Sequence, residues 1–196
     1  NLYYWHREKI ISILYILNTN YLISTSLDIN NSILIWNYET NNLIYTLRNH
    51  TKPILVLTYI NNTNFFISGS EDTTIQIWDY LKGKWIKTLQ NGHTDSINTI
   101  IYINNTNYIV SGGNDKLIIL WDYKENKIIR KFSQHNDKII SLIYIDETNL
   151  IASSSNDNTI LIWNYETWDL IRILKNTYYE TKLIYNMIYF KNLNTL

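Results

Sequence analysis

Ile75-Gln76-Ile77-Trp78-Asp79-Tyr80 is the most informative stretch of the sequence, because three close copies of it occur elsewhere in the chain. The copies cover residues 33–38, 118–123 and 160–165, and each has Trp at its fourth position. Successive tryptophans lie 42, 43 and 42 residues apart. A fixed period of this length indicates a repeat architecture in which each period forms one supersecondary unit.

Three further residue types recur with each Trp. A His precedes the Trp by 28 residues in three copies, and by 30 residues in the first. The two extra residues of the first copy fall in the segment 27–32, and with the insertion there a Ser and an Asp also align in all four periods. The aligned sets are His6, Ser24, Asp28 and Trp36; His50, Ser68, Asp72 and Trp78; His93, Ser111, Asp115 and Trp121; and His135, Ser153, Asp157 and Trp163.

Each period also divides into four short apolar runs. In the second period these are Pro53–Ile60, Phe65–Ser70, Thr74–Tyr80 and Lys84–Gln90. The runs are rich in Ile, Tyr, Val and Thr, they are bounded by clusters of Asn, Thr, Gly and Asp, and none is long enough for an amphipathic helix. Four strands in a period of about 42 residues predict an all-β protein in which each period is a propeller blade.

With these residues, the chain resembles the WD40-repeat β-propellers, and is similar to the β subunit of heterotrimeric G proteins. The resemblance covers essentially the whole sequence, with two modest departures. The usual Gly before the His is present only at Gly92, and the Asp after the Trp is replaced by Asn37 and Asn164 in two copies. The resemblance implies blades at residues 10–48, 53–90, 96–133 and 138–175, each with its first strand at the central channel.

The last residues predict an incomplete fifth blade. Residues 182–190 match an inner strand, but no middle strands of that blade are present. Seven blades, the commonest number in the family, need about 300 residues. We therefore expect an open arc from a larger, seven-bladed propeller, with the chain a fragment. The alternatives are four blades that close with frayed ends, or two chains that complete one ring.

Composition restricts the function. The chain has 196 residues, with 17 Lys and Arg against 17 Asp and Glu, and no Cys. Nucleic acids and anionic membranes reward a basic excess, so neither is an expected partner. The lack of Cys removes disulfides and thiol chemistry and favours a reducing compartment, the cytoplasm or the nucleus. The longest apolar run is too short to span a membrane.

The four aligned sets could serve catalysis, metal binding or structure. A Ser–His–Asp trio superficially matches a hydrolase triad, but it is copied four times together with Trp, and no oxyanion loop accompanies it. Successive histidines also lack the close spacing of metal ligands. The family resemblance instead implies a hydrogen-bonded structural tetrad in each blade. We therefore predict no catalytic residue, no metal and no cofactor.

The function expected from this fold is a non-catalytic scaffold or adaptor that binds peptides or protein domains. The alternative is a targeting or substrate-recruiting domain of a larger enzyme of the kinase or ubiquitin-ligase type. Exposed strand edges at the ends of an open arc predict self-association. The family resemblance places the binding face at positions three and five after each His and directly before each tetrad Asp: Lys9, Ile11, Leu27, Pro53, Leu55, Glu71, Ser96, Asn98, Asn114, Lys138, Ile140 and Asn156. The incomplete fifth blade adds Lys182 and Ile184, with Tyr179 at the position of the His.

Overall fold

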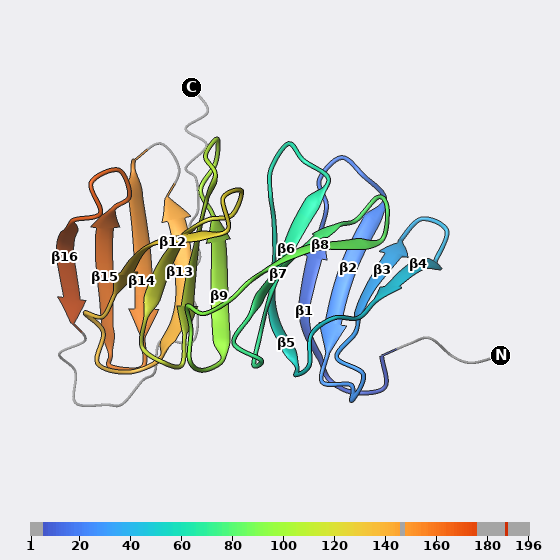
Figure 1. The fold of residues 1–196 in the computed structure, drawn as a ribbon, viewed down its shortest axis with the longest axis horizontal. Coiled ribbons are helices and arrows are strands. Elements are labelled where there is room, and N and C mark those ends of the chain that lie inside the picture. The colour runs from blue at the N-terminus through green and yellow to red at the C-terminus, as the bar shows by residue number, and fades with distance from the viewer. Residues whose placement is uncertain (1–5, 146–147, 176–186, 188–196) are drawn as a thin grey trace, which may run out of the picture.

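The computed structural model describes residues 6–145, 148–175 and 187, and this part of the chain forms four separate antiparallel sheets of four strands each (Figure 1). The predicted all-β architecture of four-stranded blades is therefore confirmed. No helix among these residues is long and apolar enough to cross a membrane. Lys182, Ile184 and the predicted strand at 182–190 are not tested, because apart from residue 187 they lie outside the described residues.

Each sheet keeps its strands in sequence order, and we call them strands A to D of a blade. Blade 1 contains β1 (Ile10–Tyr15), β2 (Tyr21–Ser26), β3 (Ile33–Asn37) and β4 (Asn42–Leu47). Blade 2 contains β5 (Ile54–Tyr59), β6 (Phe65–Ser70), β7 (Ile75–Asp79) and β8 (Lys84–Leu89). Blade 3 contains β9 (Ile97–Tyr102), β10 (Tyr108–Gly113), β11 (Ile118–Asp122) and β12 (Lys127–Phe132). Blade 4 contains β13 (Ile139–Ile145), β14 (Leu150–Ser155), β15 (Thr159–Asn164) and β16 (Leu170–Lys175).

The hairpin turns repeat from blade to blade. Between strands A and B of blade 2, Asn62 adopts a positive φ of 60° and the Thr63 hydroxyl donates to the Ile60 carbonyl oxygen at 2.7 Å. Between strands C and D, the Asp79 carboxylate accepts hydrogen bonds from two backbone N–H groups. An Asn side-chain oxygen accepts the same pair of bonds at Asn37. Either residue closes this turn, because the turn needs only the shared oxygen acceptor.

The hydrophobic core lies between neighbouring blades. Each strand A packs beside the next strand A, and strand B of one blade approaches strand A of the next. Gly69 on β6 permits this close approach, since a Cβ there would come within 2.7 Å of Ile100 and 2.9 Å of Ile97 in blade 3. A larger residue at Gly69 would therefore force these side chains, or the blades that carry them, to shift.

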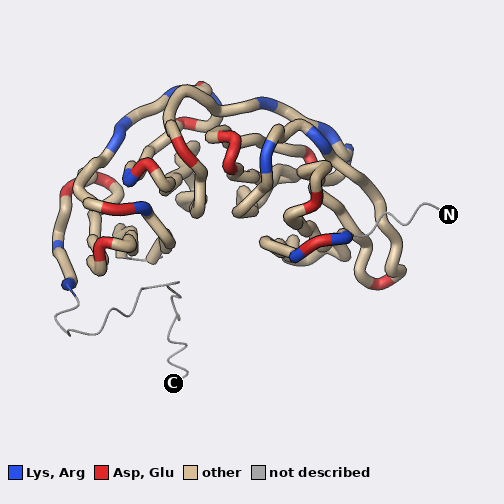
Figure 2. Tube along the Cα trace, turned by 90° about the horizontal axis from the view of Figure 1, so that it is seen from below, with Lys and Arg blue, Asp and Glu red and all other residues tan. Residues whose placement is uncertain are grey.

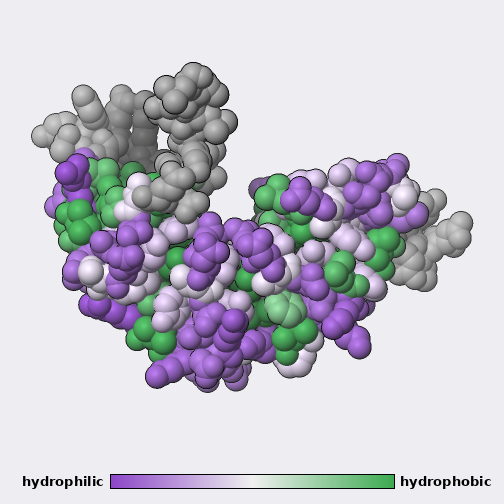
Figure 3. Space-filling view, turned by 90° about the horizontal axis from the view of Figure 1, so that it is seen from above, coloured by the Kyte–Doolittle hydropathy of each residue, from purple (hydrophilic) through white to green (hydrophobic). Residues whose placement is uncertain are grey.

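The four blades are arranged along an arc (Figure 2), with charged residues of both signs distributed around it. Within the described residues the arc does not close, and the space-filling view shows apolar patches between polar ones on its surface (Figure 3). The arrangement agrees with the expected open arc.

Candidate functional site

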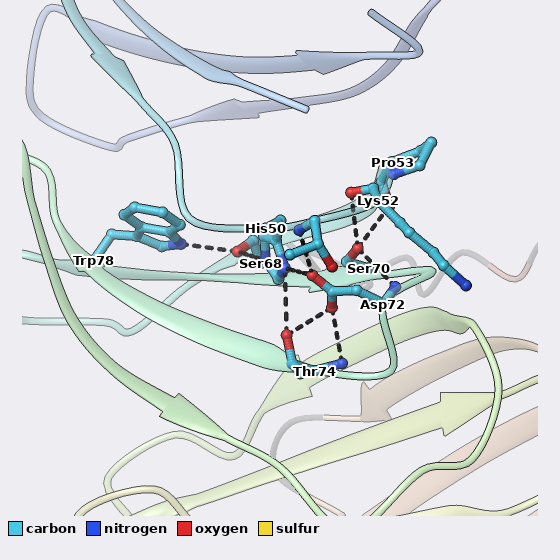
Figure 4. A network of polar contacts seen from close by, with 9 residues as sticks. His50, Lys52, Pro53, Ser68, Ser70, Asp72, Thr74 and Trp78 are labelled. Atoms are coloured by element: carbon cyan, nitrogen blue, oxygen red, sulfur yellow. Dashed lines mark hydrogen bonds and ion pairs between the residues drawn. The ribbon is translucent and has the colours of Figure 1, made fainter. Parts of the chain in front are cut away.

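The tetrad of blade 2 joins the core to a surface turn (Figure 4). His50 precedes β5, Ser68 lies on β6, Asp72 follows β6, and Trp78 lies on β7. The Trp78 Nε1 atom is 2.8 Å from Ser68 Oγ, and this oxygen is 2.8 Å from His50 Nε2. His50 Nδ1 is 2.8 Å from Asp72 Oδ2. The four side chains form one continuous series of hydrogen bonds.

The direction of each bond follows from what each group can donate. An indole N–H only donates, so Ser68 Oγ accepts from Trp78 and its own hydrogen is available for His50. His50 Nε2 is then an acceptor, and Nδ1 carries the hydrogen that is donated to the Asp72 carboxylate. One neutral histidine tautomer satisfies every link, so the series leaves none of its buried polar groups unpaired.

The other three blades repeat this geometry. The Ser Oγ to His Nε2 distances in blades 1, 3 and 4 are 2.8, 2.7 and 2.8 Å, and the shortest His Nδ1 to Asp oxygen distances are 3.0, 2.9 and 3.0 Å. The structure thus brings together the residues of every set that the sequence aligned. The corresponding Trp Nε1 to Ser Oγ distances are 2.9 Å from Trp36 to Ser24, 2.8 Å from Trp121 to Ser111 and 3.0 Å from Trp163 to Ser153.

The tetrads differ in how deeply the indole is buried. Trp78, Trp121 and Trp163 are 1%, 2% and 4% exposed, because each packs in the core against the preceding blade. Trp36 is only half-buried, since no blade precedes blade 1 among the described residues, whereas its partner Ser24 is buried within its own sheet. Among the described residues, the first tetrad therefore keeps the predicted hydrogen bonds, but no preceding blade packs against its indole as in the other three.

The Asp of each tetrad also accepts hydrogen bonds from outside the tetrad, including one from the backbone of the loop before strand A. Asp72 accepts from the backbone N–H of Thr51 at 2.9 Å and from the Thr74 hydroxyl at 2.6 Å, and Asp157 accepts from Thr159 at 2.6 Å in the same way. Sequence reasoning missed the two threonines, although each stands two residues after its Asp. In blade 1, where the turn is two residues longer, the Ser26 hydroxyl donates to Asp28 instead.

Burial and hydrogen bonding have opposite effects on the carboxylates. Burial alone would raise the pKa of Asp72, because it penalises the charged form. The hydrogen bonds that the carboxylate accepts from His50, Thr74 and Thr51 outweigh burial and place its pKa well below the usual range. The pKa values of the other three tetrad carboxylates are lowered by the same balance. In blade 4, burial lowers the pKa of His135 and so favours the neutral ring.

The surroundings of the tetrad serines fit a structural role and not a nucleophilic one. Ser24 is 4% exposed and Ser68, Ser111 and Ser153 are fully buried, and each hydroxyl is engaged by both Trp and His. A nucleophile needs an accessible oxygen beside a site for the reacting carbonyl, and these oxygens have neither. Among the described residues, no group of three or more His, Cys, Asp or Glu side chains could hold a metal ion.

The predicted binding-face residues form a repeated array. In each blade, the residue before the tetrad Asp donates its backbone N–H to the carbonyl oxygen of the residue three after the His. The N–H to carbonyl pairs, at 2.8 to 3.1 Å, are Leu27 to Lys9, Glu71 to Pro53, Asn114 to Ser96 and Asn156 to Lys138. We call the surface formed by these eight residues and by Ile11, Leu55, Asn98 and Ile140 the B–C rim.

The B–C rim is less exposed than a free loop surface. Lys9 and Leu27 are exposed, and the remaining ten residues are half-buried. The Asn98 side chain connects blades 3 and 4. Its amide donates to Asn114 Oδ1 in blade 3 and to the Ile139 carbonyl oxygen in blade 4, both at 2.8 Å. The rim carries Lys9, Glu71 and Lys138 as its charged side chains, so no single sign of charge dominates it.

The fold, the tetrads and the period define a β-propeller built from repeats. The sequence profile described as "WD domain, G-beta repeat" matches residues 41–79, 83–122 and 126–164, which together exceed half of the chain. The chain belongs to the WD40-repeat family. Each matched segment begins near strand D of one blade and ends at strand C of the next, so the sequence repeat is offset from the structural blade.

Solved propellers share this fold. Structures titled "Structure of U3-55K" and "Crystal structure of RRP9 WD40 repeats" each superpose with a TM-score of 0.79 over 87% of this chain, at 17% sequence identity. The superposition covers 53% and 52% of those chains, so this chain spans about half of their length. No curated protein matches the sequence significantly.

Proposed function

We propose that the chain is a non-catalytic protein-interaction module that binds a peptide or a protein domain on its B–C rim, as a scaffold or adaptor. WD40 propellers generally act as interaction modules, which supports this role. The cytoplasmic or nuclear location expected from the lack of Cys stays a prediction.

The repeated backbone pairing at the rim carries the proposal. In each blade a hydrogen bond of 2.8 to 3.1 Å fixes the turn between strands B and C against the loop before strand A. The tetrad beneath stabilises the same two segments. A rim whose backbone is fixed at four successive points has little backbone freedom left to lose, which favours binding.

Selection from a random peptide library against the immobilised chain tests the proposal. Binding of the selected peptides is then measured by fluorescence anisotropy with the unmodified chain and with two rim variants, Glu71→Lys and Lys138→Glu. We expect each reversal to weaken binding of rim-directed peptides by about tenfold. The variant Lys124→Glu, in the turn between strands C and D of blade 3, is the matched control.

The outcome separates the rim from the rest of the surface. Peptides that lose affinity with the rim variants and keep it with Lys124→Glu support the proposal. Selected peptides that bind both rim variants as tightly as the unmodified chain would overturn it.

A further inference from the structure

A second candidate binding surface lies at the opposite end of the strands. An open groove of about 670 Å³ separates blades 3 and 4, beside the turn between strands A and B of blade 3 and the turn between strands C and D of blade 4. Six of its ten lining residues are aromatic or aliphatic, Asn104, Asn105 and Thr106 are polar, and Glu166 is charged. The residues that matter here are Tyr108, Leu120, Tyr144, Tyr165, Glu166 and Trp168.

At the two other blade interfaces, a side chain from strand D bridges to the next blade at the corresponding place. The Tyr45 hydroxyl of blade 1 donates to the Leu81 carbonyl oxygen of blade 2 at 3.2 Å. The Lys87 ammonium of blade 2 donates to the Lys124 carbonyl oxygen of blade 3 at 2.9 Å. Tyr45 and Lys87 both stand nine residues after the tetrad Trp of their blade.

Blade 3 uses this position differently. The equivalent residue is Arg130, and its guanidinium carbon lies 5.1 Å from the centroid of the Phe132 ring. Arg130 does not line the groove, and Glu166, the counterpart of Leu81 and Lys124, does. The third interface is therefore open where the first two are bridged.

Trp168 is a further difference at this interface. Its backbone has a positive φ of 63°, in a turn where the other blades place Asn41, Gly83 and Asn126. A bulky residue is strained in this conformation, whereas Gly and Asn adopt it readily. The ring centroid lies 5.6 Å from that of Phe132, so packing holds the indole at the groove. Strained residues are enriched at binding sites, which makes the groove a candidate for one.

The lining favours a cation. The rings of Tyr144 and Tyr165 meet edge to face at 5.3 Å, and with Trp168 they surround part of the groove. Aromatic faces attract ammonium and guanidinium groups. The Glu166 side chain is exposed, and none of the ion pairs among the described residues involves it. We propose that this groove binds one basic side chain, Lys or Arg, from an extended segment of a partner protein.

Short blocked peptides test the proposal. Ala-Ala-Arg-Ala-Ala is titrated into the 196-residue chain, and the indole N–H signal of Trp168 is followed by NMR, with Trp168→Asn used to assign that signal. Peptides with Lys, Gln or Glu at the centre are compared. We expect the Arg and Lys peptides to shift the signal saturably, and the Gln and Glu peptides to bind at least about tenfold more weakly.

Variants locate the site. Glu166→Lys is expected to weaken binding of the Arg peptide at least about tenfold, and Glu166→Gln several-fold. Glu39→Lys, at the same repeat position in blade 1, makes the same charge change and is expected to leave binding unchanged. Trp168→Asn introduces the residue that blade 3 uses at Asn126, so it is expected to keep the fold and lose the affinity.

Binding to the Trp168→Asn variant is followed by the fluorescence anisotropy of a labelled Arg peptide, and its folding by its melting temperature. Equal effects of Glu166→Lys and Glu39→Lys would overturn the proposal, as would a folded Trp168→Asn variant that binds as before. A Glu-centred peptide that binds as well as the Arg peptide would do the same. The rim variants are expected to leave this binding unchanged, so the two proposals fail independently.

Discussion

Trp121 shows how one residue combines packing and polar satisfaction. Its side chain is 2% exposed, lies in the core between blades 2 and 3, and donates to Ser111 Oγ at 2.8 Å. Gly92, in the loop before strand A, leaves room for the ring, because a Cβ there would come within 2.2 Å of it. A larger residue at Gly92 would therefore require the ring of Trp121 or the loop to shift.

Replacing Trp121 by Ala is expected to lower the free energy of unfolding by about 3–5 kcal/mol, through lost packing and the cavity left behind. Trp121→Phe keeps a ring and loses the N–H donor, so a loss of about 1–3 kcal/mol is expected. Chemical denaturation of both variants measures the two effects. Because the tetrad is structural, we expect Trp121→Ala to lose solubility and any partner binding together. An unchanged melting temperature for Trp121→Ala would contradict the role assigned to the tetrad.

Acid should destabilise the fold in two stages. Burial lowers the pKa of His135 in the folded state. The contribution of the neutral ring to the free energy of unfolding is therefore complete above the pKa of the unfolded chain, about 6.5, and is lost as the pH falls through the folded pKa. The lowered pKa values of the tetrad carboxylates add a second loss that begins near the unfolded value of about 3.9. Denaturation midpoints measured from about pH 8 to about pH 3 check both stages, and His135→Gln should remove the first. Constant stability between about pH 7 and about pH 5 would disprove the first stage.

At the scale of the element, the turn between strands B and C of blade 2 has one strained position. Thr73 has a positive φ of 69°, which is unfavourable for a β-branched residue, and blade 4 places Asn158 there. Thr73→Asn is expected to raise the free energy of unfolding by about 1 kcal/mol. The neighbouring variant Thr74→Val provides the comparison. It removes the Thr74 hydroxyl that donates to Asp72 at 2.6 Å, so it should lower the free energy of unfolding by about 1–2 kcal/mol. Urea midpoints that move in the same direction for both variants would contradict this interpretation.

Repetition explains which elements could be predicted from the sequence. In blade 2 the expected run Thr74–Tyr80 is observed as β7, Ile75–Asp79, since period and strand composition place a strand but its last residues depend on where the turn bonds begin. The grouping of each His with its Ser, Asp and Trp likewise followed from their alignment. The open arc was expected to leave the face of the first blade uncovered, but the repeat alignment did not single out the half-buried Trp36, because it treats all four tryptophans as equivalent.

The groove between blades 3 and 4 could not be predicted in this way. It depends on Arg130 lying against Phe132 when its counterparts bridge to the next blade, and a sequence pattern does not contain that choice of rotamer. The available signal was Trp168, which stands where the other blades place Asn or Gly. That departure from the repeat marks the position but does not show what its ring would contact.

For the whole molecule, the first blade presents a surface that the other blades bury. Ile54 and Leu57 on β5 are 1% and 8% exposed, because blade 1 covers them. Ile10 and Ile13 occupy the same positions on β1 and are 48% and 59% exposed. This face has the side chains of a blade interface, and the described residues place no blade against it. Exposed strands and apolar patches of this kind promote association.

We therefore expect the 196-residue chain to self-associate through the face of β1. Light scattering should give a mass above 23.4 kDa that rises with concentration. The double variant Ile10→Ser/Ile13→Ser should shift the mass toward 23.4 kDa, because it removes the apolar contact area without touching the core between blades 1 and 2. Ile29→Ser is the matched control, since Ile29 is 93% exposed in a turn away from that face. If the unmodified chain has a mass of 23.4 kDa at all concentrations, or if Ile29→Ser dissociates it as well as the double variant does, the face of β1 is not the contact.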